Sequence, residues 1–240
     1  GVRTIVSDFE TVMKIRTMQE LLFVVHTQTD SNVLSTDPET LAAQLAESDL
    51  MQILTETHKG DVSFCFRIGV SGTMPLEERS IFAKRVAAAI EGAFERNLIN
   101  STSHYEVELR LLQHREGGFV PLLKLYTLRD HRFDYRRYYV AASMKPTLAA
   151  GLIALAKPYL KEYAQILDPF CGVGTLLMER RFAVPARNAY GIDTFGEAIE
   201  KARVNSKIAG MQTNYINRDY FDFVHDYKFD EIVTDLPAGN

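Results

Sequence analysis

Residues 166–180 read ILDPFCGVGTLLMER. An apolar run ends here at the carboxylate of Asp168, Gly172 and Gly174 follow, and a helical pattern begins directly after them. A glycine-rich turn between a strand and a helix lets backbone amides approach a ligand closely. At the carboxyl edge of a parallel sheet that ligand is typically a nucleotide-like cofactor. The stretch therefore predicts an α/β fold with a binding site at this turn.

The loop does not fit the two common phosphate-binding patterns. It lacks the Gly-Lys-Ser/Thr triplet of a P-loop. A dinucleotide-binding loop would continue to a glycine or alanine where Leu177 stands, and Asp168 would repel a diphosphate. A carboxylate at this point suits a cofactor with a cationic end, such as S-adenosylmethionine, which carries an ammonium and a sulfonium group. The alternative is a plain turn in which Asp168 only caps the helix.

Three further acidic residues follow predicted strands in the same half of the chain. Short apolar runs alternate with helical segments from residue 146 onward, which is typical of a parallel, doubly wound sheet. Asp193 comes 25 residues after Asp168, near the offset of about 20 at which an acid binds ribose hydroxyls in such folds. Asp219 follows the third run and Asp235-Leu236-Pro237 ends the fourth, so all four acids are expected at one edge of the sheet.

The first half of the chain has a different pattern. Strands are predicted over 20–28, 62–70, 105–113 and 119–128, with the last two as a hairpin, and helices over 36–54 and 75–97. Thr36 or Asp37 is the expected cap of the first helix, with Pro38 in its first turn. Residues 81, 82, 86, 90 and 94 form an apolar stripe on the second helix, which we expect in the core. These elements indicate a small mixed α+β unit.

A basic segment interrupts an otherwise acidic chain. The net charge is -4, yet residues 110–137 hold seven basic residues against three acidic ones. Aromatic residues lie between these charges, and aromatic rings can stack on unpaired bases. RNA binding is one interpretation and a solvated strand face with a charged linker is the other. The seven basic residues are Arg110, Arg115, Lys124, Arg129, Arg132, Arg136 and Arg137.

The composition argues against several other classes of protein. No apolar stretch approaches the roughly 20 residues of a membrane span and no signal sequence opens the chain, so a cytoplasmic protein without membrane contact is expected. Cys65 and Cys171 are far apart and the six histidines are scattered, so neither disulfides nor a metal site is expected. A nucleophilic role for Cys171 is also not expected.

The ordered motifs resemble a known family. DPFCGVGT, YGID, AIEKARVNSKIAG, NRD and TDLPAG look like the motifs of class I S-adenosylmethionine-dependent methyltransferases. The preceding RFDYRRYYVAASMKPTLAAGLIALA is similar to a segment of THUMP-containing RNA guanine-N2 methyltransferases, and DLP resembles the tRNA-modifying branch. The resemblance implies a partial ferredoxin-like domain over 1–60, a THUMP-like RNA-binding domain over 61–127, a linker over 128–145 and a Rossmann-like methyltransferase domain over 146–240.

The same resemblance implies roles for individual residues. S-adenosylmethionine would be held by the loop residues Asp168, Phe170, Gly172, Gly174 and Thr175, with Asp193 at the ribose and Asp219 at the adenine. Asp235 and the Leu236 or Pro237 carbonyl would accept hydrogen bonds from the exocyclic amine of a flipped-out guanine.

Two features depart from the family pattern. Ala238 stands where an aromatic residue usually follows the proline, and the chain stops directly after this motif, so we expect the methyltransferase fold to be incomplete at its C-terminal end. The predicted function is methylation of guanosine N2 in structured RNA, with tRNA as the expected substrate. The alternatives are an rRNA guanine-N2 or N6-adenine methyltransferase, or a non-catalytic RNA-binding protein. The oligomeric state is not predicted.

Overall fold

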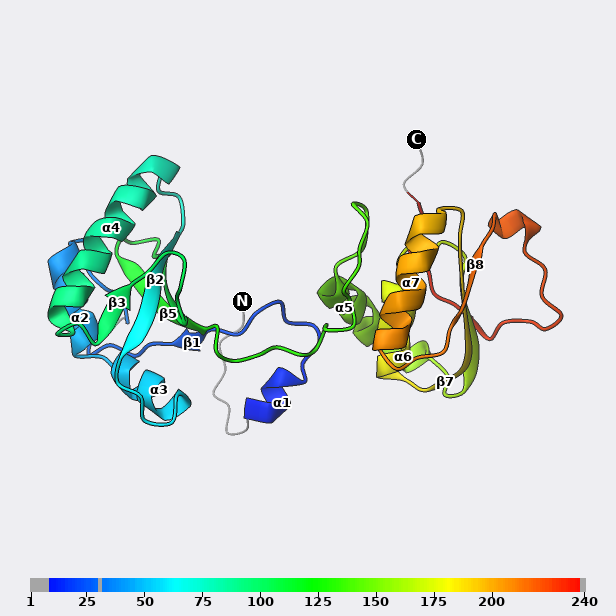
Figure 1. The fold of residues 1–240 in the computed structure, drawn as a ribbon, viewed down its shortest axis with the longest axis horizontal. Coiled ribbons are helices and arrows are strands. Elements are labelled where there is room, and N and C mark those ends of the chain that lie inside the picture. Colours follow the sequence, from blue (N-terminus) through cyan, green and yellow to red (C-terminus); the bar gives the residue numbers. More distant parts are fainter. Residues whose placement is uncertain (1–8, 30–31, 238–240) are drawn as a thin grey trace. The chain divides into compact units, whose positions relative to one another are not determined.

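The computed structural model describes residues 9–29 and 32–237, which fall into two compact units (Figure 1). Residues 20–129 form one of them, here called the mixed-sheet unit. The other, here called the parallel-sheet unit, combines the described residues up to Gln19 with those from Asp130 onward. None of the described helices is long and apolar enough to cross a bilayer.

The mixed-sheet unit has one five-stranded sheet in the order β1-β5-β4-β2-β3. Strands β4 and β5 form the predicted antiparallel hairpin, while β2 runs parallel to both β3 and β4. Helices α2 and α4 lie side by side and cover one face of this sheet (Figure 1). The bounds are β1 Phe23–Val24, α2 Pro38–Ala46, α3 Leu50–Thr57, β2 Phe64–Ser71, α4 Leu76–Ala93, β3 Leu98–Asn100, β4 Val107–Gln113 and β5 Phe119–Leu125.

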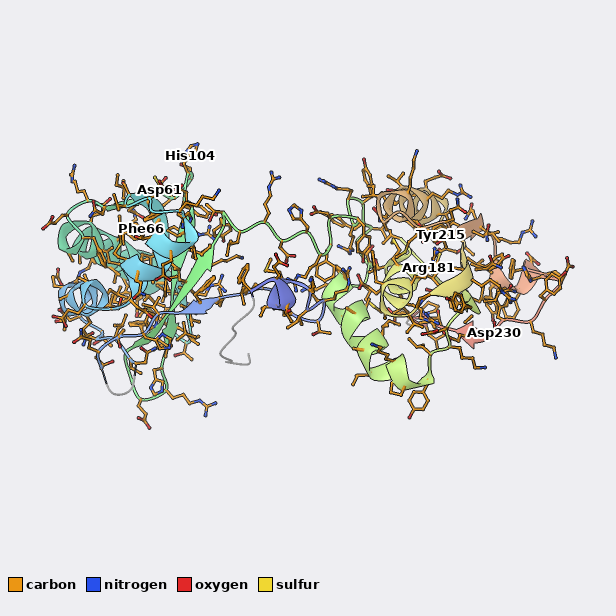
Figure 2. The ribbon with its side chains drawn as sticks, turned by 90° about the horizontal axis from the view of Figure 1, so that it is seen from below. Asp61, Phe66, His104, Arg181, Tyr215 and Asp230 are labelled. Carbon is orange, nitrogen blue, oxygen red and sulfur yellow. The ribbon has the colours of Figure 1, made fainter. Side chains whose placement is uncertain are left out.

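A single core holds the mixed-sheet unit together. Phe66 on β2 lies in its interior and packs in one cluster with Leu41 of α2 and Leu123 of β5 (Figure 2). Val86 and Ile90 of α4 are fully buried as predicted, whereas Ile81 is 63 % exposed, so its assignment to the core was wrong. Because residues on both sides of position 60 share this core, the structure draws no domain boundary there.

The helix predicted over 36–54 is two helices. Asp37 caps the first, because its carboxylate accepts the Thr40 amide at 3.0 Å. The chain breaks between them at Asp49, whose side chain accepts the His26 amide at 2.7 Å and whose own amide donates to the His26 carbonyl at 3.2 Å. These bonds tie Asp49 to the chain beside β1 and interrupt the helical pattern.

The parallel-sheet unit contains four parallel strands in the order β8-β7-β6-β9. The chain moves outward from β6 through β7 to β8 and then returns to the other side of β6, which makes the doubly wound arrangement that the sequence predicts. Ligands of such sheets bind where the order reverses, outside the carboxyl ends of the strands. The bounds are α1 Phe9–Met13, α5 Pro146–Ala156, η1 Lys157–Tyr159, β6 Ala164–Asp168, α6 Thr175–Ala183, β7 Ala186–Asp193, α7 Gly196–Ile208, β8 Asn214–Asn217, η2 Tyr220–Asp222 and β9 Glu231–Ile232.

Two segments outside the predicted domain are part of this unit. Arg16 donates through two nitrogens to the buried carboxylate of Glu179, at 2.7 and 2.9 Å, and the Tyr135 hydroxyl donates to the same carboxylate at 2.6 Å. The backbone of Tyr138 exchanges two hydrogen bonds with the Asn205 side chain on α7. The segment expected as a linker is therefore fixed on the parallel-sheet unit from residue 130 onward.

Candidate functional site

A cavity of about 640 Å³ opens at the carboxyl ends of β6, β7 and β9. All four acidic residues predicted to meet at this edge line it, together with most of the loop after β6. Gly174 is the one predicted member of the cofactor or catalytic set that does not line the cavity. The predicted residues that do are Asp168, Phe170, Gly172, Thr175, Asp193, Asp219, Asp235 and Pro237.

Asp168 is the most deeply buried of the four acids, with 1 % of its surface exposed. Its Oδ1 accepts the Thr234 hydroxyl at 2.8 Å and the Phe170 amide at 3.1 Å. Burial raises the pKa of Asp168 to about 7, and these two donors only partly offset the rise. No cation among the described residues forms an ion pair with it, so a cationic ligand group in the cavity would favour its charged form.

Backbone geometry explains the two glycines of the loop. Gly172 and Gly174 have φ angles of 53° and 78°, in the left-handed region that glycine adopts without steric cost. A Cβ at Gly174 would lie 2.3 Å from the Tyr215 hydroxyl oxygen, whereas one at Gly172 would meet nothing within 4 Å. Gly174 therefore shapes the turn at the start of α6, and Gly172 lines the cavity.

Asp193 joins the loop after β6 to the loop after β7. Its two carboxylate oxygens accept the amides of Gly172 and Phe195, each at 2.8 Å. Each oxygen keeps a free lone pair, so the residue can still accept hydroxyl groups from a ligand in the cavity. The structure thus gives Asp193 an organising role in the loop that its spacing alone does not predict.

Thr175 supplies an unpaired polar atom at the cavity. The residue is 3 % exposed, and its hydroxyl has no hydrogen-bond partner in the described part of the chain. Buried hydroxyl groups are normally paired, and an exception indicates a missing partner. Together with the acids of the cavity, this hydroxyl fits a polar, partly cationic ligand such as S-adenosylmethionine.

The acids that follow β8 and β9 are more exposed than Asp168. Asp219 caps η2 by accepting the Phe221 amide at 3.0 Å, and it lines the cavity from an exposed position. Asp235, Leu236 and Pro237 are exposed and line the same cavity as Asp168. Ala238, the departure from the family motif, lies outside the described residues.

Sequence reasoning missed part of the cavity wall. Val140, Ser143 and Met144 line the cavity from the segment that the sequence predicts to be a linker. Their signal was weak, because the segment has no regular periodicity. Cys171 also lines the cavity, and burial raises the pKa of its thiol, so the structure gives no support for a nucleophile there.

The seven basic residues predicted to bind RNA have different environments. In the mixed-sheet unit, Arg110 pairs with Glu108 and Glu20, and Lys124 pairs with Glu20. In the parallel-sheet unit, Arg132 is buried and bonds to Asp130 and to the carbonyls of Ile15 and Met18. Arg136 is half-buried and donates to the Met144 carbonyl at 3.2 Å. Arg115, Arg129 and Arg137 are exposed and form no ion pair with a carboxylate of the described residues.

Comparison with known proteins agrees with this geometry. The family model described as RMKL-like, methyltransferase domain matches residues 134–240. Residues 134–240 are therefore similar to this methyltransferase domain. TrmN from Thermus thermophilus superimposes with a TM-score of 0.61 at 22 % identity, over 86 % of this chain and 60 % of that protein. A putative methyltransferase complexed with SAH gives 0.66 at 17 % identity, over 96 % of this chain and 70 % of that one. The predicted class I methyltransferase fold is thus confirmed.

Curated relatives match a part of this chain. The tRNA (guanine(10)-N2)-dimethyltransferase of Methanothermobacter thermautotrophicus is 34 % identical over 112 residues, which cover 46 % of this chain and 31 % of the relative. The U6 snRNA (guanine-N(2))-methyltransferase THUMPD2 of Bos taurus is 28 % identical over 113 residues, which cover 43 % and 21 %. The matched part spans about a third or less of these relatives.

Proposed function

We propose that this protein transfers a methyl group from S-adenosylmethionine to the exocyclic N2 of a guanosine in structured RNA, with tRNA as the first candidate. One observation carries the proposal: the Asp235-Leu236-Pro237 turn lines the same cavity as the buried Asp168. The guanine-N2 specificity is supported by the names of both matched relatives, and the tRNA specificity by that of the archaeal one. A cytoplasmic location is part of the proposal.

Each wall of the cavity has a distinct task in this proposal. S-adenosylmethionine, when bound, supplies an electrophilic methyl group. Asp168 would face its cationic end, the Thr175 hydroxyl and the loop amides would bond to its polar atoms, and Asp193 and Asp219 would hold its ribose and adenine. The opposite wall would then be left for the base that is methylated.

The turn after β9 would orient the amine. An arylamine nitrogen is a poor nucleophile until acceptors fix its two N–H bonds and direct its lone pair. The Asp235 carboxylate and the carbonyl of Leu236 or Pro237 would supply those acceptors. No strong base is required, because the proton can leave after transfer. The mixed-sheet unit would serve as the THUMP-like and ferredoxin-like RNA-binding part. Arg115, on the turn between β4 and β5, and Arg129 are among its exposed cations.

Methylation by an Asp235→Ala variant tests this assignment. Loss of the acceptor should lower the initial rate of label transfer to RNA by about 100-fold or more, because orientation of the amine is lost. Cofactor affinity should stay within about twofold, because Asp235 faces the base side. The matched control is Asp222→Ala, which removes an exposed acid that does not line the cavity. An Asp235→Ala variant with the control's rate would contradict the assigned role.

The product distinguishes the alternatives. An acid near a proline can orient any exocyclic amine, so N6-methyladenosine in the digested RNA would favour the adenine alternative. N2-methylguanosine from rRNA, but not from tRNA, would favour the rRNA alternative. Cofactor binding without methylation of any RNA would favour the non-catalytic RNA-binding alternative.

A further inference from the structure

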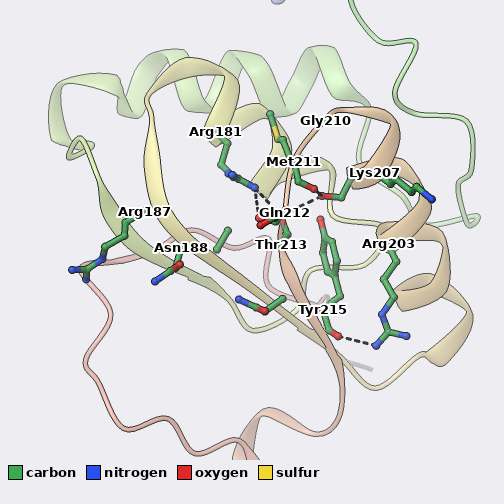
Figure 3. A pocket seen from close by; sticks show the side chains of 13 residues that line it. Arg181, Arg187, Asn188, Arg203, Lys207, Gly210, Met211, Gln212, Thr213 and Tyr215 are labelled. Atoms are coloured by element: carbon green, nitrogen blue, oxygen red, sulfur yellow. Dashed lines mark hydrogen bonds between the residues drawn. The ribbon is translucent and has the colours of Figure 1, made fainter.

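A second cavity, of about 700 Å³, lies at the opposite edge of the parallel sheet (Figure 3). It is lined by the beginnings of β7 and β8, by the last turns of α6 and α7, and by the turn over residues 210–213. None of its lining residues also lines the cavity at Asp168. We call this second cavity the basic pocket.

Its charge is uniformly positive. Four lining residues are basic and none is acidic: Arg181, Arg187, Arg203 and Lys207. Figure 3 shows Arg181 directed toward the turn at Gln212 and Thr213, with Arg187 and Lys207 at two sides of the group. Arg203 pairs with Glu200, and Arg187 lies 4.0 Å from Asp230. Both pairs are solvent-exposed, and the interaction energy of an exposed ion pair is small. The basic pocket therefore keeps most of its positive potential.

Arg181 is the cation that most needs an anionic partner. It lies beside Tyr215 (Figure 2), and its Nη1 donates to the Gln212 carbonyl at 2.6 Å and to the Thr213 hydroxyl at 3.0 Å. No carboxylate among the described residues pairs with it, and partial burial lowers its pKa. A half-buried guanidinium with only neutral acceptors is incompletely compensated, and a bound anion would complete its environment.

Helix polarity explains only part of this cluster. Arg181 and Lys207 lie in the last turns of their helices, where cations are favourable on electrostatic grounds alone. Arg187 lies near the start of β7 and Arg203 one turn before Lys207. All four line one cavity that has no lining acid, and this indicates a ligand with several negative charges.

We infer that the basic pocket binds backbone phosphates of the RNA substrate. This inference rests on the proposed function for the identity of the polyanion. The two cavities lie at opposite ends of β7, whose eight residues span about 25 Å. An RNA that reaches both must span several nucleotides, which a free nucleotide does not. The basic pocket thus supplies a reason for a preference for an RNA chain that the methylation site alone lacks.

Paired charge removals test the inference. The variant Arg187→Gln/Lys207→Gln removes two of the three exposed cations and leaves the Arg181 bonds intact. The control Lys157→Gln/Lys228→Gln makes the same charge change at exposed positions of the same unit outside the basic pocket. RNA affinity of the whole chain is measured at several salt concentrations, and S-adenosylmethionine affinity is measured in parallel.

We expect the pocket variant to bind tRNA about 3- to 10-fold more weakly at 150 mM salt and to lower the salt slope by about 1 to 2, as each phosphate contact contributes nearly one. The control should match the wild type, and cofactor affinity should be unchanged in both. If the wild type binds RNA and the two variants bind it with equal affinity, the inference about the basic pocket is overturned, while the proposed RNA substrate is not. A wild type that binds cofactor but no RNA would overturn the RNA substrate as well.

A further arm separates RNA from small phosphates. Inorganic pyrophosphate is added to each protein and the thermal midpoint is followed. Competition between pyrophosphate and RNA that disappears in the pocket variant would support the inference. Protection of the wild type by pyrophosphate, with RNA affinity equal in both variants, would assign the basic pocket to a free phosphate compound and overturn it.

Discussion

At the scale of the residue, Asp168 connects stability with function. Its pKa of about 7 lies above the ordinary value for an aspartate, so the folded chain without ligand disfavours the charged form. The folded state then binds more protons than the unfolded state, and the unfolding free energy falls as pH rises from about 4 to about 7. Such a cost is typical of a functional group, because a structural aspartate would have acquired a cation or more donors.

The variant Asp168→Asn tests that cost in the absence of cofactor. Asparagine Oδ1 can keep both hydrogen bonds that Asp168 accepts from Thr234 and Phe170. The difference in unfolding free energy, variant minus wild type, should be about 1–3 kcal/mol larger at pH 8 than at pH 5. Urea unfolding at both pH values measures it. An equal difference in unfolding free energy between variant and wild type at pH 5 and at pH 8 would mean that Asp168 has an ordinary pKa.

Gly174 is a second residue with a specific prediction. Alanine there combines a left-handed φ of 78° with a Cβ that would overlap the Tyr215 hydroxyl, so we expect a loss of about 2–4 kcal/mol. Gly172→Ala is the matched control, with a similar φ but open space, and should cost about 1 kcal/mol. Tyr215→Phe should partly rescue Gly174→Ala. Equal losses at the two glycines in chemical unfolding would refute the steric argument.

These residues show how far sequence reasoning reached. The loop from Asp168 to Thr175 could be predicted because its chemistry follows the chain locally, with a strand end, two glycines and a helix start. The bond from Gly172 to Asp193 could not, because it joins two loops and depends on strand register. The unpaired Thr175 hydroxyl likewise became visible only once its neighbours were in place.

At the scale of the element, the segment from 130 to 145 and the chain after α1 act as a brace on α6. Both reach the buried carboxylate of Glu179, through Tyr135 and Arg16. This arrangement could not be read from the sequence, since the three residues lie far apart along the chain and follow no shared periodicity. The same limit explains the missed division of the helix over 36–54, where a bond to His26, which lies after β1, overrode a helical pattern.

Removing only the cation of the Arg16–Glu179 pair should lower the unfolding free energy more than removing both charges together. In Arg16→Ala the Glu179 carboxylate stays buried without its cation, so we expect a loss of about 2–4 kcal/mol. The double variant Arg16→Ala/Glu179→Gln should be at least about 1 kcal/mol more stable than Arg16→Ala, because no buried charge remains. Denaturant unfolding of the three proteins checks this order. A double variant less stable than the single one would show that Glu179 is stabilised without Arg16.

At the scale of the whole molecule, each unit carries its own part of the account. The parallel-sheet unit holds the cavity at Asp168 and the basic pocket at its two edges, and the mixed-sheet unit carries a sheet with a charged face around Glu108. The alternation of strands and helices predicted the first unit well. The ion pairs of Arg110 and Lys124 could not be predicted, because Glu20 reaches them from a distant part of the chain.

The central claim is that the cavity at Asp168 binds S-adenosylmethionine through its cationic end. Calorimetric titration of the cofactor into the wild type and Asp168→Asn at pH 8 tests it most directly. We predict saturable one-site binding to the wild type and at least about 10-fold weaker binding to the variant, a loss of about 1.4 kcal/mol. No saturable binding to the wild type, or equal affinity in both proteins, would contradict the account.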